Sequence, residues 1–576
     1  MSSGRVLAGD RPEPVSCVFG CCGRAMQLAS PADSEARAWL VLLAACGVAW
    51  FAVLGLRPLF NPDEGRYAQI PAEMLASGDF ILPRLDGVVY LEKPPLQYWT
   101  TALALRVFGH NEWAARFSTA ASAALALVFI WLLGRRAFGA EHGLMAAAMT
   151  ASMLLYVFMG QLITLDMALS CFLTIAVVSF CLGQLERERA PAACRGWMLA
   201  CWAAMAAATL TKGLVGLVIP GSVLVLYTLL QRDRAAWRHL HLVKGLALYA
   251  LIVLPWFLLV ERAHRGALDF LIVHEHFQRY LTTVHERYQP WWYFLPILAA
   301  GSLPWLPQAA RALLTGWRAS RPPGSFDPAR VLWVGAAFVL VFFSLSDSKL
   351  APYVVPVLPL LALLGAGRGP AAVAGLRQAA LLQAALGVAL AAGIVLYGRR
   401  TLDAEAAATL TALRPWLIAV TGVLLLGGLG AWRLGTRSFG AAARALAASG
   451  FAVALLLIVG GAGSIAARWS GRGLLAAAGP LAPGAPLYAV RCFDWTAPFY
   501  TGRFVTPVEW RGELDYGLKF EPDRGLAGLP EFTAIWRELP SGYALLPLAT
   551  GRRLAASGLP MRSLAQDFNH VLVSRQ

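Results

Sequence analysis

The sequence predicts a polytopic α-helical membrane protein of about thirteen transmembrane helices with a small C-terminal α/β domain. The chain has 576 residues and is 58% hydrophobic, while only 14% of its residues are charged, against roughly 25% in globular proteins. Its mean hydropathy is +0.58. Apolar runs close to the ~20 residues that cross a bilayer core recur along the chain. Part of its solvent must therefore be lipid.

Thirteen apolar segments can be marked, and the fifth and the tenth are short for a full crossing. They lie near residues 38–56, 113–134, 141–160, 164–183, 196–210, 212–231, 244–261, 291–311, 329–346, 350–366, 376–396, 414–433 and 443–466. The count is good to one or two. The membrane domain is therefore expected over residues 36–468, after a polar stretch at 1–35 that is expected to be disordered or to precede the true start.

The positive charges of the chain predict its orientation. The net charge is +16, and every even-numbered connection between the segments is basic. The connections contain Arg135, Arg136, Arg187, Arg189, Arg195, Arg232, Arg234, Arg238, Lys244, Arg311, Arg318, Arg321, Arg330, Arg368, Arg377, Arg433, Arg437 and Arg444. Basic connections stay cytoplasmic, so the N-terminus is expected inside and the C-terminus outside. Orientation and contact with anionic lipid explain the charge, and no nucleic-acid partner is expected.

Three polar pieces then lie on the outer side, at 57–112, 262–290 and 469–576. The last contains short β-rich runs at 487–490, 544–547 and 570–573 between Gly/Pro turns, which predicts a small α/β domain. The nine Cys show no paired CxxC spacing, so we expect no disulfide framework.

The first outer loop concentrates charged residues near its start. Pro62 precedes Asp63 and Glu64, and Gly65 follows them, which predicts a tight helix start. The apolar residues Ala72, Met74, Leu75 and Ala76 give this helix a face suited to the membrane interface. Carboxylates in a first turn also stabilise the helix dipole, so the spacing alone leaves a structural and a catalytic interpretation open.

Four longer patterns in the same region make a family resemblance. They are Asn-Pro-Asp-Glu-Gly-Arg-Tyr-Ala at 61–68, Glu-Met-Leu-Ala-Ser-Gly-Asp at 73–79, Tyr-Leu-Glu-Lys-Pro-Pro-Leu-Gln-Tyr-Trp at 90–99 and Asn-Glu-Trp-Ala-Ala-Arg at 111–116. Together they resemble the aminoarabinose transferases, which are GT-C glycosyltransferases related to the protein O-mannosyltransferases. The resemblance is close through Arg136 and extends over the rest of the chain in layout.

The resemblance implies transfer of 4-amino-4-deoxy-L-arabinose from undecaprenyl phosphate to phosphate groups of lipid A. The reaction would take place on the periplasmic face of a Gram-negative inner membrane. It would lower the negative charge of the outer membrane and give resistance to polymyxin and cationic antimicrobial peptides. The expected partners are the lipid-linked sugar donor, lipid A and membrane lipids, and the expected state is a monomer.

The resemblance makes Asp63, with Glu64 beside it, the leading catalytic candidate in the first periplasmic loop. A phosphate acceptor is already anionic near neutral pH, and a carboxylate next to it is repulsive. Asp63 is therefore expected to orient the acceptor, to accept a residual proton or to engage the ammonium of the sugar. Asp166, at a membrane boundary, resembles the second acidic position of the superfamily. A helix-start cap is its alternative role, which Thr164 could also fill.

The carrier phosphate that leaves needs fixed cations where negative charge develops. Lys93 and Arg279 of the first two outer loops are the main candidates, against a plain role in contacting lipid headgroups. Further candidates for the phosphate are Tyr353, Tyr90, Lys349 and Lys212.

The second outer loop is rich in imidazoles, at His264, His274, His276 and His285. Either these are solvated side chains at the interface, or His274, His276 and His285 form with Glu92 of the first loop a structural site for a divalent ion such as zinc. No cofactor is expected to be required, because cationic side chains can hold a monophosphate carrier.

Two other functions remain open from the sequence. A related GT-C enzyme could move mannose or another polyprenyl-linked sugar onto protein or lipid. A lipid transporter also has many spans and intramembrane charge, but its halves usually repeat and no repeat is visible here. A purely structural scaffold would leave the charged loop at 61–93 unexplained.

Overall fold

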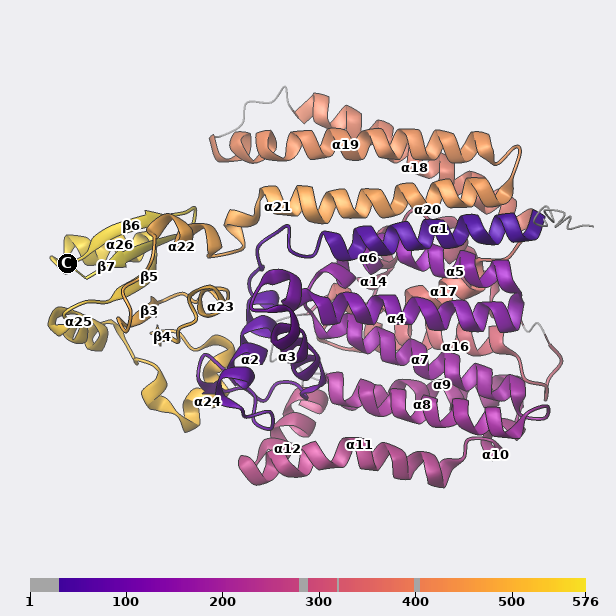
Figure 1. The fold of residues 1–576 in the computed structure, drawn as a ribbon, viewed down its shortest axis with the longest axis horizontal. Helices are drawn as coiled ribbons and strands as arrows, with labels where there is room; N and C mark the ends of the chain where they lie inside the picture. The colour runs from indigo at the N-terminus through magenta and orange to yellow at the C-terminus, as the bar shows by residue number, and fades with distance from the viewer. Residues whose placement is uncertain (1–30, 279–287, 319–320, 398–403, 576) are drawn as a thin grey trace, which may run out of the picture.

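The computed structural model describes residues 31–278, 288–318, 321–397 and 404–575. A bundle of long helices forms one part, and an α/β domain built from the C-terminal residues lies at one end of it (Figure 1). Two shorter helices, α2 (Asp63–Ser77) and α3 (Leu96–Phe108), lie between the bundle and this domain.

Nine helices in the described part of the chain are long and apolar enough to cross a membrane. They are α1 (Pro31–Ala52), α4 (Glu112–Phe138), α7 (Leu165–Glu186), α8 (Pro191–Lys212), α11 (Leu242–Ala263), α16 (Pro328–Leu345), α18 (Pro370–Tyr397), α19 (Ala404–Leu434) and α20 (Phe439–Leu455) with its continuation to Ser464. A helix pairs its own main-chain groups, which lipid cannot do.

The other four predicted segments are helical but short or interrupted. They form α5 (Ala140–Ser152) with α6 (Leu154–Gln161), α9 (Val215–Gln231), α14 (Phe294–Gly301) with α15 (Leu306–Thr315), and η2 (Ala351–Val354) with α17 (Val357–Gly365). The pair α5 and α6 bends by 65°. The expected shortness of the tenth segment is confirmed, but that of the fifth is wrong, because α8 extends beyond the apolar run at both ends. The count of thirteen crossings stays a prediction.

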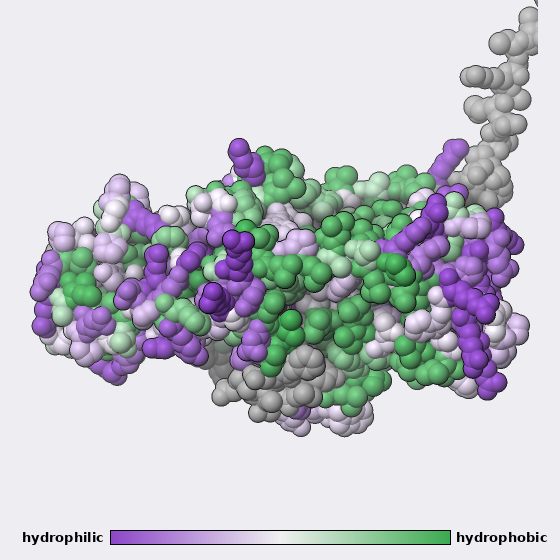
Figure 2. All heavy atoms as spheres, turned by 90° about the horizontal axis from the view of Figure 1, so that it is seen from below, coloured by the Kyte–Doolittle hydropathy of each residue, from purple (hydrophilic) through white to green (hydrophobic). Residues whose placement is uncertain are grey.

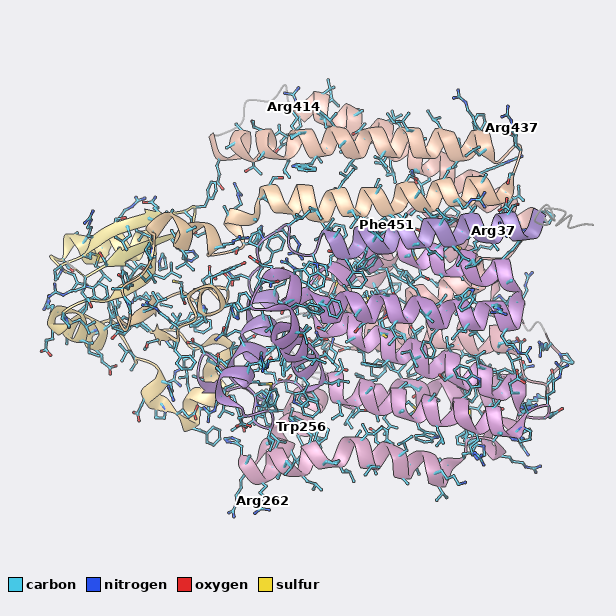
Figure 3. The ribbon with its side chains drawn as sticks, in the orientation of Figure 1. Arg37, Trp256, Arg262, Arg414, Arg437 and Phe451 are labelled. Atoms are coloured by element: carbon cyan, nitrogen blue, oxygen red, sulfur yellow. The ribbon has the colours of Figure 1, made fainter. Side chains whose placement is uncertain are left out.

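Ion pairs join the connections that the charge pattern places on one side. Arg444 pairs with Glu35 near the N-terminus, and Arg187 lies 3.0 Å from Asp233. Arg37 and Arg437 both lie at the end of the bundle opposite the C-terminal domain (Figure 3). The start of α1 and these basic connections thus share one end, as expected.

Hydrophobic residues cover the middle of the bundle, whereas hydrophilic residues gather toward its two ends (Figure 2). Large apolar side chains such as Leu229, Leu251 and Leu426 are exposed on the outside of the helices. Surfaces of this extent are stable only in lipid. The chain is a multi-pass membrane protein.

The C-terminal domain is a five-stranded mixed sheet with helices around it. Its strands are β3 (Leu487–Val490), β4 (Val505–Val508), β5 (Tyr543–Pro547), β6 (Arg562–Gln566) and β7 (His570–Ser574), in the order β4-β3-β5-β7-β6. β3 is parallel to β4 and β5, and β7 is antiparallel to β5 and β6. The helices are α22 (Arg472–Ala478), α23 (Ala497–Thr501), α24 (Asp515–Phe520), α25 (Leu529–Glu538) and α26 (Leu548–Ala556).

The predicted α/β domain and its three β-rich runs are confirmed. The runs correspond to β3, β5 and β7, the inner strands of the sheet. The edge strands were missed, because Pro507 interrupts the apolar pattern of β4 and β6 is mostly polar and only partly buried.

The first outer loop forms α2 (Asp63–Ser77), the hairpin β1 (Arg84–Leu85) and β2 (Val88–Val89), and α3 (Leu96–Phe108). The predicted helix start at Asp63 is confirmed. The apolar face of α2, including Ile70 and Met74, packs in one cluster with Trp495 and Phe499 of the C-terminal domain. Protein therefore covers much of the face that was expected to meet the membrane interface.

Candidate active site

Asp63 stands in the first turn of α2 and is half exposed. Its carboxylate accepts a hydrogen bond from Arg66 at 2.5 Å, and the Asp63 side chain keeps 49% of its surface accessible. Arg66 is buried and also pairs with Glu513 of the C-terminal domain. Asp63 is thus an accessible carboxylate on a fixed support, which suits a group that meets a substrate.

Glu64, its neighbour, is enclosed by two arginines. Arg116 donates to the two Glu64 oxygens at 2.8 and 2.9 Å, and Arg57 donates at 2.5 and 3.1 Å. The main-chain N–H groups of Phe60 and Ile163 complete the shell. Burial raises the pKa of Glu64, but the charges of Arg116 and Arg57 outweigh it and lower the pKa to about 2. Glu64 connects α2 to α4 through Arg116. We therefore assign it a structural role and not a catalytic one.

Asp166, Lys212 and Tyr353 come together from three separate connections. Lys212 at the end of α8 pairs with Asp166 at the start of α7. The Lys212 ammonium also lies 4.4 Å from the centroid of the Tyr353 ring in η2, a cation–π distance. Thr164 is the N-cap residue of α7, but its hydroxyl makes no cap hydrogen bond. Asp166 is therefore paired with a cation, as a charge at a membrane boundary requires.

Lys93 is buried at the junction of the first two outer loops. Its ammonium pairs with Glu275 in η1 (Phe270–Gln278) and donates to the main-chain oxygen of Glu92 at 2.6 Å. The ammonium is thus held inside the protein by Glu275, and its predicted contact with phosphate stays a prediction. Glu275 was not among the predicted site residues, although the sequence places it beside the imidazoles of that loop.

Tyr90 and Lys349 are both buried at the same end of the bundle. The Tyr90 hydroxyl has no hydrogen-bond partner among the residues that the structure describes, and burial raises the pKa of Tyr90 well above its usual value. Lys349 donates to the main-chain oxygen of Ser346 at 2.5 Å and lies 5.8 Å from the ring centroid of Tyr288. Burial lowers the pKa of Lys349, although Asp347 counteracts it.

The predicted metal ligands are only partly visible. Arg279 and His285 lie outside the described residues, as does the side chain of His276. The His274 ring stacks on Phe270 with centroids 4.8 Å apart. Within the described ranges, no group of three metal-ligating side chains occurs, so the zinc site stays a prediction.

The arginines around Glu64 were also missed as site residues. Arg116 lies within the predicted second span and is fully buried, and Arg57 directly follows the first span. A lone arginine in an apolar segment is costly unless it has a buried partner. That cost was the available signal that Arg116 has a buried acidic partner, which the structure identifies as Glu64.

The visible site therefore combines one accessible carboxylate with lysines that are held by acidic partners. Asp63, Lys93 and Lys212 come from the first loop and from the outer end of α8. Such a set can bind phosphate groups and stabilise a phosphate that leaves. It lies at the end of the bundle next to the C-terminal domain (Figure 1).

Comparison with known proteins agrees with these features. Residues 475–575 match the family described as "Aminoarabinose transferase C-terminal domain", and residues 92–258 match "Dolichyl-phosphate-mannose-protein mannosyltransferase". The structure of ArnT from Cupriavidus metallidurans bound to undecaprenyl phosphate is similar with a TM-score of 0.84 and 34% identity. That similarity covers 94% of this chain and 98% of the other.

Curated relatives are similar over the larger part of their length. The undecaprenyl phosphate-alpha-4-amino-4-deoxy-L-arabinose arabinosyl transferase 1 of Sodalis glossinidius is 35% identical over 339 residues, which are 58% of this chain and 59% of that protein. The corresponding transferase of Pseudomonas paraeruginosa is 35% identical over 344 residues, or 59% and 60%. The aligned part of the chain thus spans about three fifths of these relatives.

Proposed function

This chain belongs to the aminoarabinose transferase family, and we propose that it transfers 4-amino-4-deoxy-L-arabinose from undecaprenyl phosphate to phosphate groups of lipid A. The proposal includes location in a Gram-negative inner membrane with the site facing the periplasm, action as a monomer, and a resulting resistance to polymyxin. The observation that carries it is the convergence of Asp166, Lys212 and Tyr353 from three connections at the end of the bundle beside Asp63 and its loop.

The chemistry follows from the charges of these groups. A phosphate oxygen of the acceptor attacks the anomeric carbon of the sugar, the bond from that carbon to the carrier phosphate breaks, and undecaprenyl phosphate leaves with the electron pair. Lys212 and Lys93 are the proposed ligands of the carrier phosphate, with Arg279, Tyr353, Tyr90 and Lys349 as further candidates. The leaving phosphate then forms beside fixed positive charge.

Lys212 and Lys93 each have an acidic partner that holds the ammonium group in place. Asp166 holds Lys212 and Glu275 holds Lys93. A bound phosphate would share each ammonium with its carboxylate, so the side chain stays ordered before and after the reaction. Fixed cations of this kind need little reorganisation during reaction.

Asp63 is the proposed group on the acceptor side. It is accessible and keeps one hydrogen bond from Arg66. Because the acceptor phosphate is anionic, we assign Asp63 to orienting the acceptor, to taking its residual proton or to engaging the ammonium of the sugar. Repulsion between two anions disfavours plain general-base action.

The proposal requires no cofactor, because cationic side chains bind a monophosphate carrier. A structural ion held by Glu92, His274, His276 and His285 remains part of the prediction. Full activity in excess chelator would support the metal-independent reaction, and loss of activity that zinc restores would contradict it.

The decisive test uses purified protein in liposomes with the lipid-linked sugar and lipid A. Mass spectrometry should detect lipid A enlarged by one aminopentose, and a mannosyl donor should give no product. Transfer from the mannosyl donor alone would instead identify the mannosyltransferase alternative. Movement of either lipid across the bilayer without product would indicate a transporter.

A further inference from the structure

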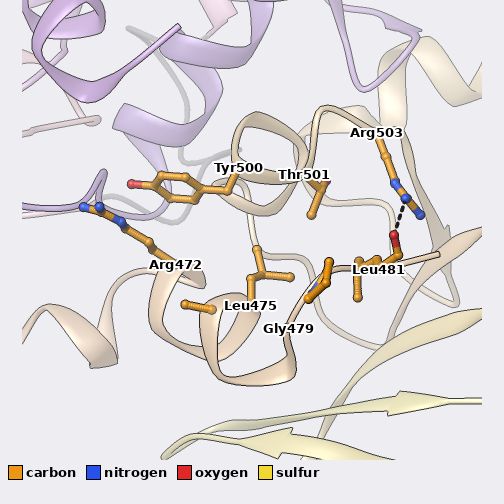
Figure 4. A pocket seen from close by; sticks show the side chains of 9 residues that line it. Arg472, Leu475, Gly479, Leu481, Tyr500, Thr501 and Arg503 are labelled. Carbon is orange, nitrogen blue, oxygen red and sulfur yellow. Dashed lines mark hydrogen bonds between the residues drawn. The ribbon is translucent and has the colours of Figure 1, made fainter. Parts of the chain in front are cut away.

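A pocket of about 520 Å³ opens in the C-terminal domain, and its lining does not include Asp63, Lys93 or Lys212. Arg472 of α22 lies toward one end of it and Arg503 toward the other, with Tyr500 and Thr501 of α23 between them (Figure 4). The pocket holds two guanidinium groups, which are donors suited to an anion, while the hydroxyls of Tyr500 and Thr501 donate to Glu112 and to the main-chain oxygen of Ala497.

The charge in this pocket has one sign. None of the nine described residues that line the pocket is acidic. Two nitrogens of Arg503 donate to the main-chain oxygens of Leu481 and Ala485 at 2.9 and 3.1 Å. These bonds hold the Arg503 guanidinium in place. An arginine has five N–H donors, so this arrangement leaves others to contact a ligand.

Arg472 is held differently, by a carboxylate from the bundle. Its guanidinium lies 2.9 Å from Glu112 at the start of α4, while its side chain keeps 52% of its surface accessible. It also lies 5.9 Å from the ring centroid of Tyr500. Glu112 itself is not part of the pocket lining, so the exposed face of Arg472 can meet a ligand.

The wall of the pocket is bonded directly to the first outer loop. The Tyr500 hydroxyl accepts a hydrogen bond from the main-chain N–H of Leu59 at 2.7 Å and donates to Glu112 at 3.2 Å. The N–H of Asn61 donates to the main-chain oxygen of Trp469 at 2.6 Å. The pocket therefore adjoins the segment that leads to Asp63.

We propose that this pocket binds a second phosphate of the acceptor glycolipid while another phosphate of the same molecule reacts near Asp63. This inference rests on the proposed function for the identity of the acceptor. The ligand class is a phosphorylated amino sugar, and Arg472 and Arg503 are its phosphate ligands. An acceptor held at two points is presented to the site in one orientation.

The test compares acceptors that differ by one phosphate. Lipid A with two phosphates and lipid A that keeps only the reacting phosphate are each titrated with wild-type protein and Arg472→Gln. We expect Arg472→Gln to raise KM about tenfold for the first acceptor, since one charge-assisted contact is lost, and to leave KM for the second unchanged. Glu112→Gln breaks the same ion pair but keeps the guanidinium, and should leave both KM values near wild type. Arg552→Gln, at an exposed site in α26, is a further control.

A binding measurement separates this site from the proposed reaction. Deacylated glucosamine disaccharide bisphosphate is titrated into the purified full chain by calorimetry without sugar donor, with inorganic phosphate as a second titrant. The site is supported if the wild type binds the disaccharide more tightly than inorganic phosphate and if Arg472→Gln weakens binding of the disaccharide about tenfold. This result would support the site even if no transfer is found.

Three results would overturn the inference. One is an equal change of KM for both acceptors in Arg472→Gln. Another is the same loss in Glu112→Gln as in Arg472→Gln, which would trace the effect to the ion pair. The third is unchanged binding of the bisphosphate by Arg472→Gln. This result counts if the wild type transfers sugar to lipid A and the variant keeps its melting temperature.

Discussion

The ammonium group of Lys212 lies 4.4 Å from the centroid of the Tyr353 ring while it pairs with Asp166. The three side chains start from the end of α8, from η2 and from the start of α7. Lys212 thus links three connections that are distant in sequence. Its positive charge is shared between a carboxylate and an aromatic face, and both partners also limit where a phosphate can approach it.

Replacement of Lys212 tests whether this cation binds substrate or only holds the helices together. Lys212→Met should lower kcat/KM by tenfold or more, about 1.4 kcal/mol, and should lower stability because Asp166 loses its partner. The double variant Asp166→Asn with Lys212→Met should recover much of the melting temperature. Recovery of transfer along with stability would show that the pair has only a structural role.

Asp63→Asn should reduce transfer by roughly a hundredfold or more, since misplacing a reacting group by about 1 Å costs about that much. The melting temperature should stay nearly unchanged, because the single ion pair of the half-exposed Asp63 stabilises the fold little. Asp515→Asn is the matched control, since Asp515 is similarly exposed and similarly paired with Arg511 and Lys519. Near-normal rates of aminopentose transfer by Asp63→Asn would remove Asp63 from the mechanism.

Glu64→Gln should have the opposite pattern, with a large loss of stability. Breaking this buried cluster leaves Arg57 and Arg116 without their anion, at a cost of about 3 to 5 kcal/mol. The pKa of Glu64 is lowered in the folded protein to about 2, so its stabilising contribution is present above the ordinary value near 4.5. That contribution is lost as the pH falls through the folded pKa.

Unfolding in detergent between pH 5 and pH 2 measures this dependence. The wild type should lose stability steeply below roughly pH 4, and Glu64→Gln should lose less over the same range. An identical pH profile for both proteins would contradict the assignment of this cluster.

Asp86→Asn should stabilise the protein at neutral pH. Burial raises the pKa of Asp86 well above its usual range, the Val505 N–H lowers it, and Glu73 raises it further. A raised folded pKa means that stability declines as the pH rises from the unfolded value through the folded one. Asn still accepts the hydrogen bond from Val505, which is 2.8 Å long. It also tolerates the left-handed backbone of this position, where φ is 56°.

The melting temperature of Asp86→Asn relative to wild type checks this prediction. The gain should be present at pH 7 and should shrink toward pH 4, where wild-type Asp86 is protonated. Asp523→Asn, an exposed site in the same domain as Val505, should show no such gain. A lower melting temperature for Asp86→Asn at pH 7 would indicate that the charge itself stabilises the contact.

The sequence predicted the architecture well because hydrophobic length and basic connections are local signals. All thirteen apolar segments are helical, and the three inner strands β3, β5 and β7 lie where short β-rich runs placed them. The edge strands lacked that signal, since an edge has one free side and tolerates proline and polar residues.

The site was predicted less completely because its contacts are not local. The pairing of Lys93 with Glu275 spans 182 residues, and that of Arg116 with Glu64 spans 52. Sequence reasoning identified Asp63 and Glu64 as one acidic pair, yet their surroundings separate them. Only the arrangement of Arg57 and Arg116 distinguishes the buried carboxylate from the accessible one.

The hydrogen bond between Asp86 and Val505 joins positions that are 419 residues apart. A ribosome that adds about 5 to 20 residues per second needs roughly 20 to 80 s to make that interval. During this time the first loop has left the ribosome without the domain against which it packs. Newly made chains therefore pass through a period in which Asp63 is present but its support is missing. Chains that end before the C-terminal domain would remain in that state, with the apolar face of α2 open to chaperones and proteases.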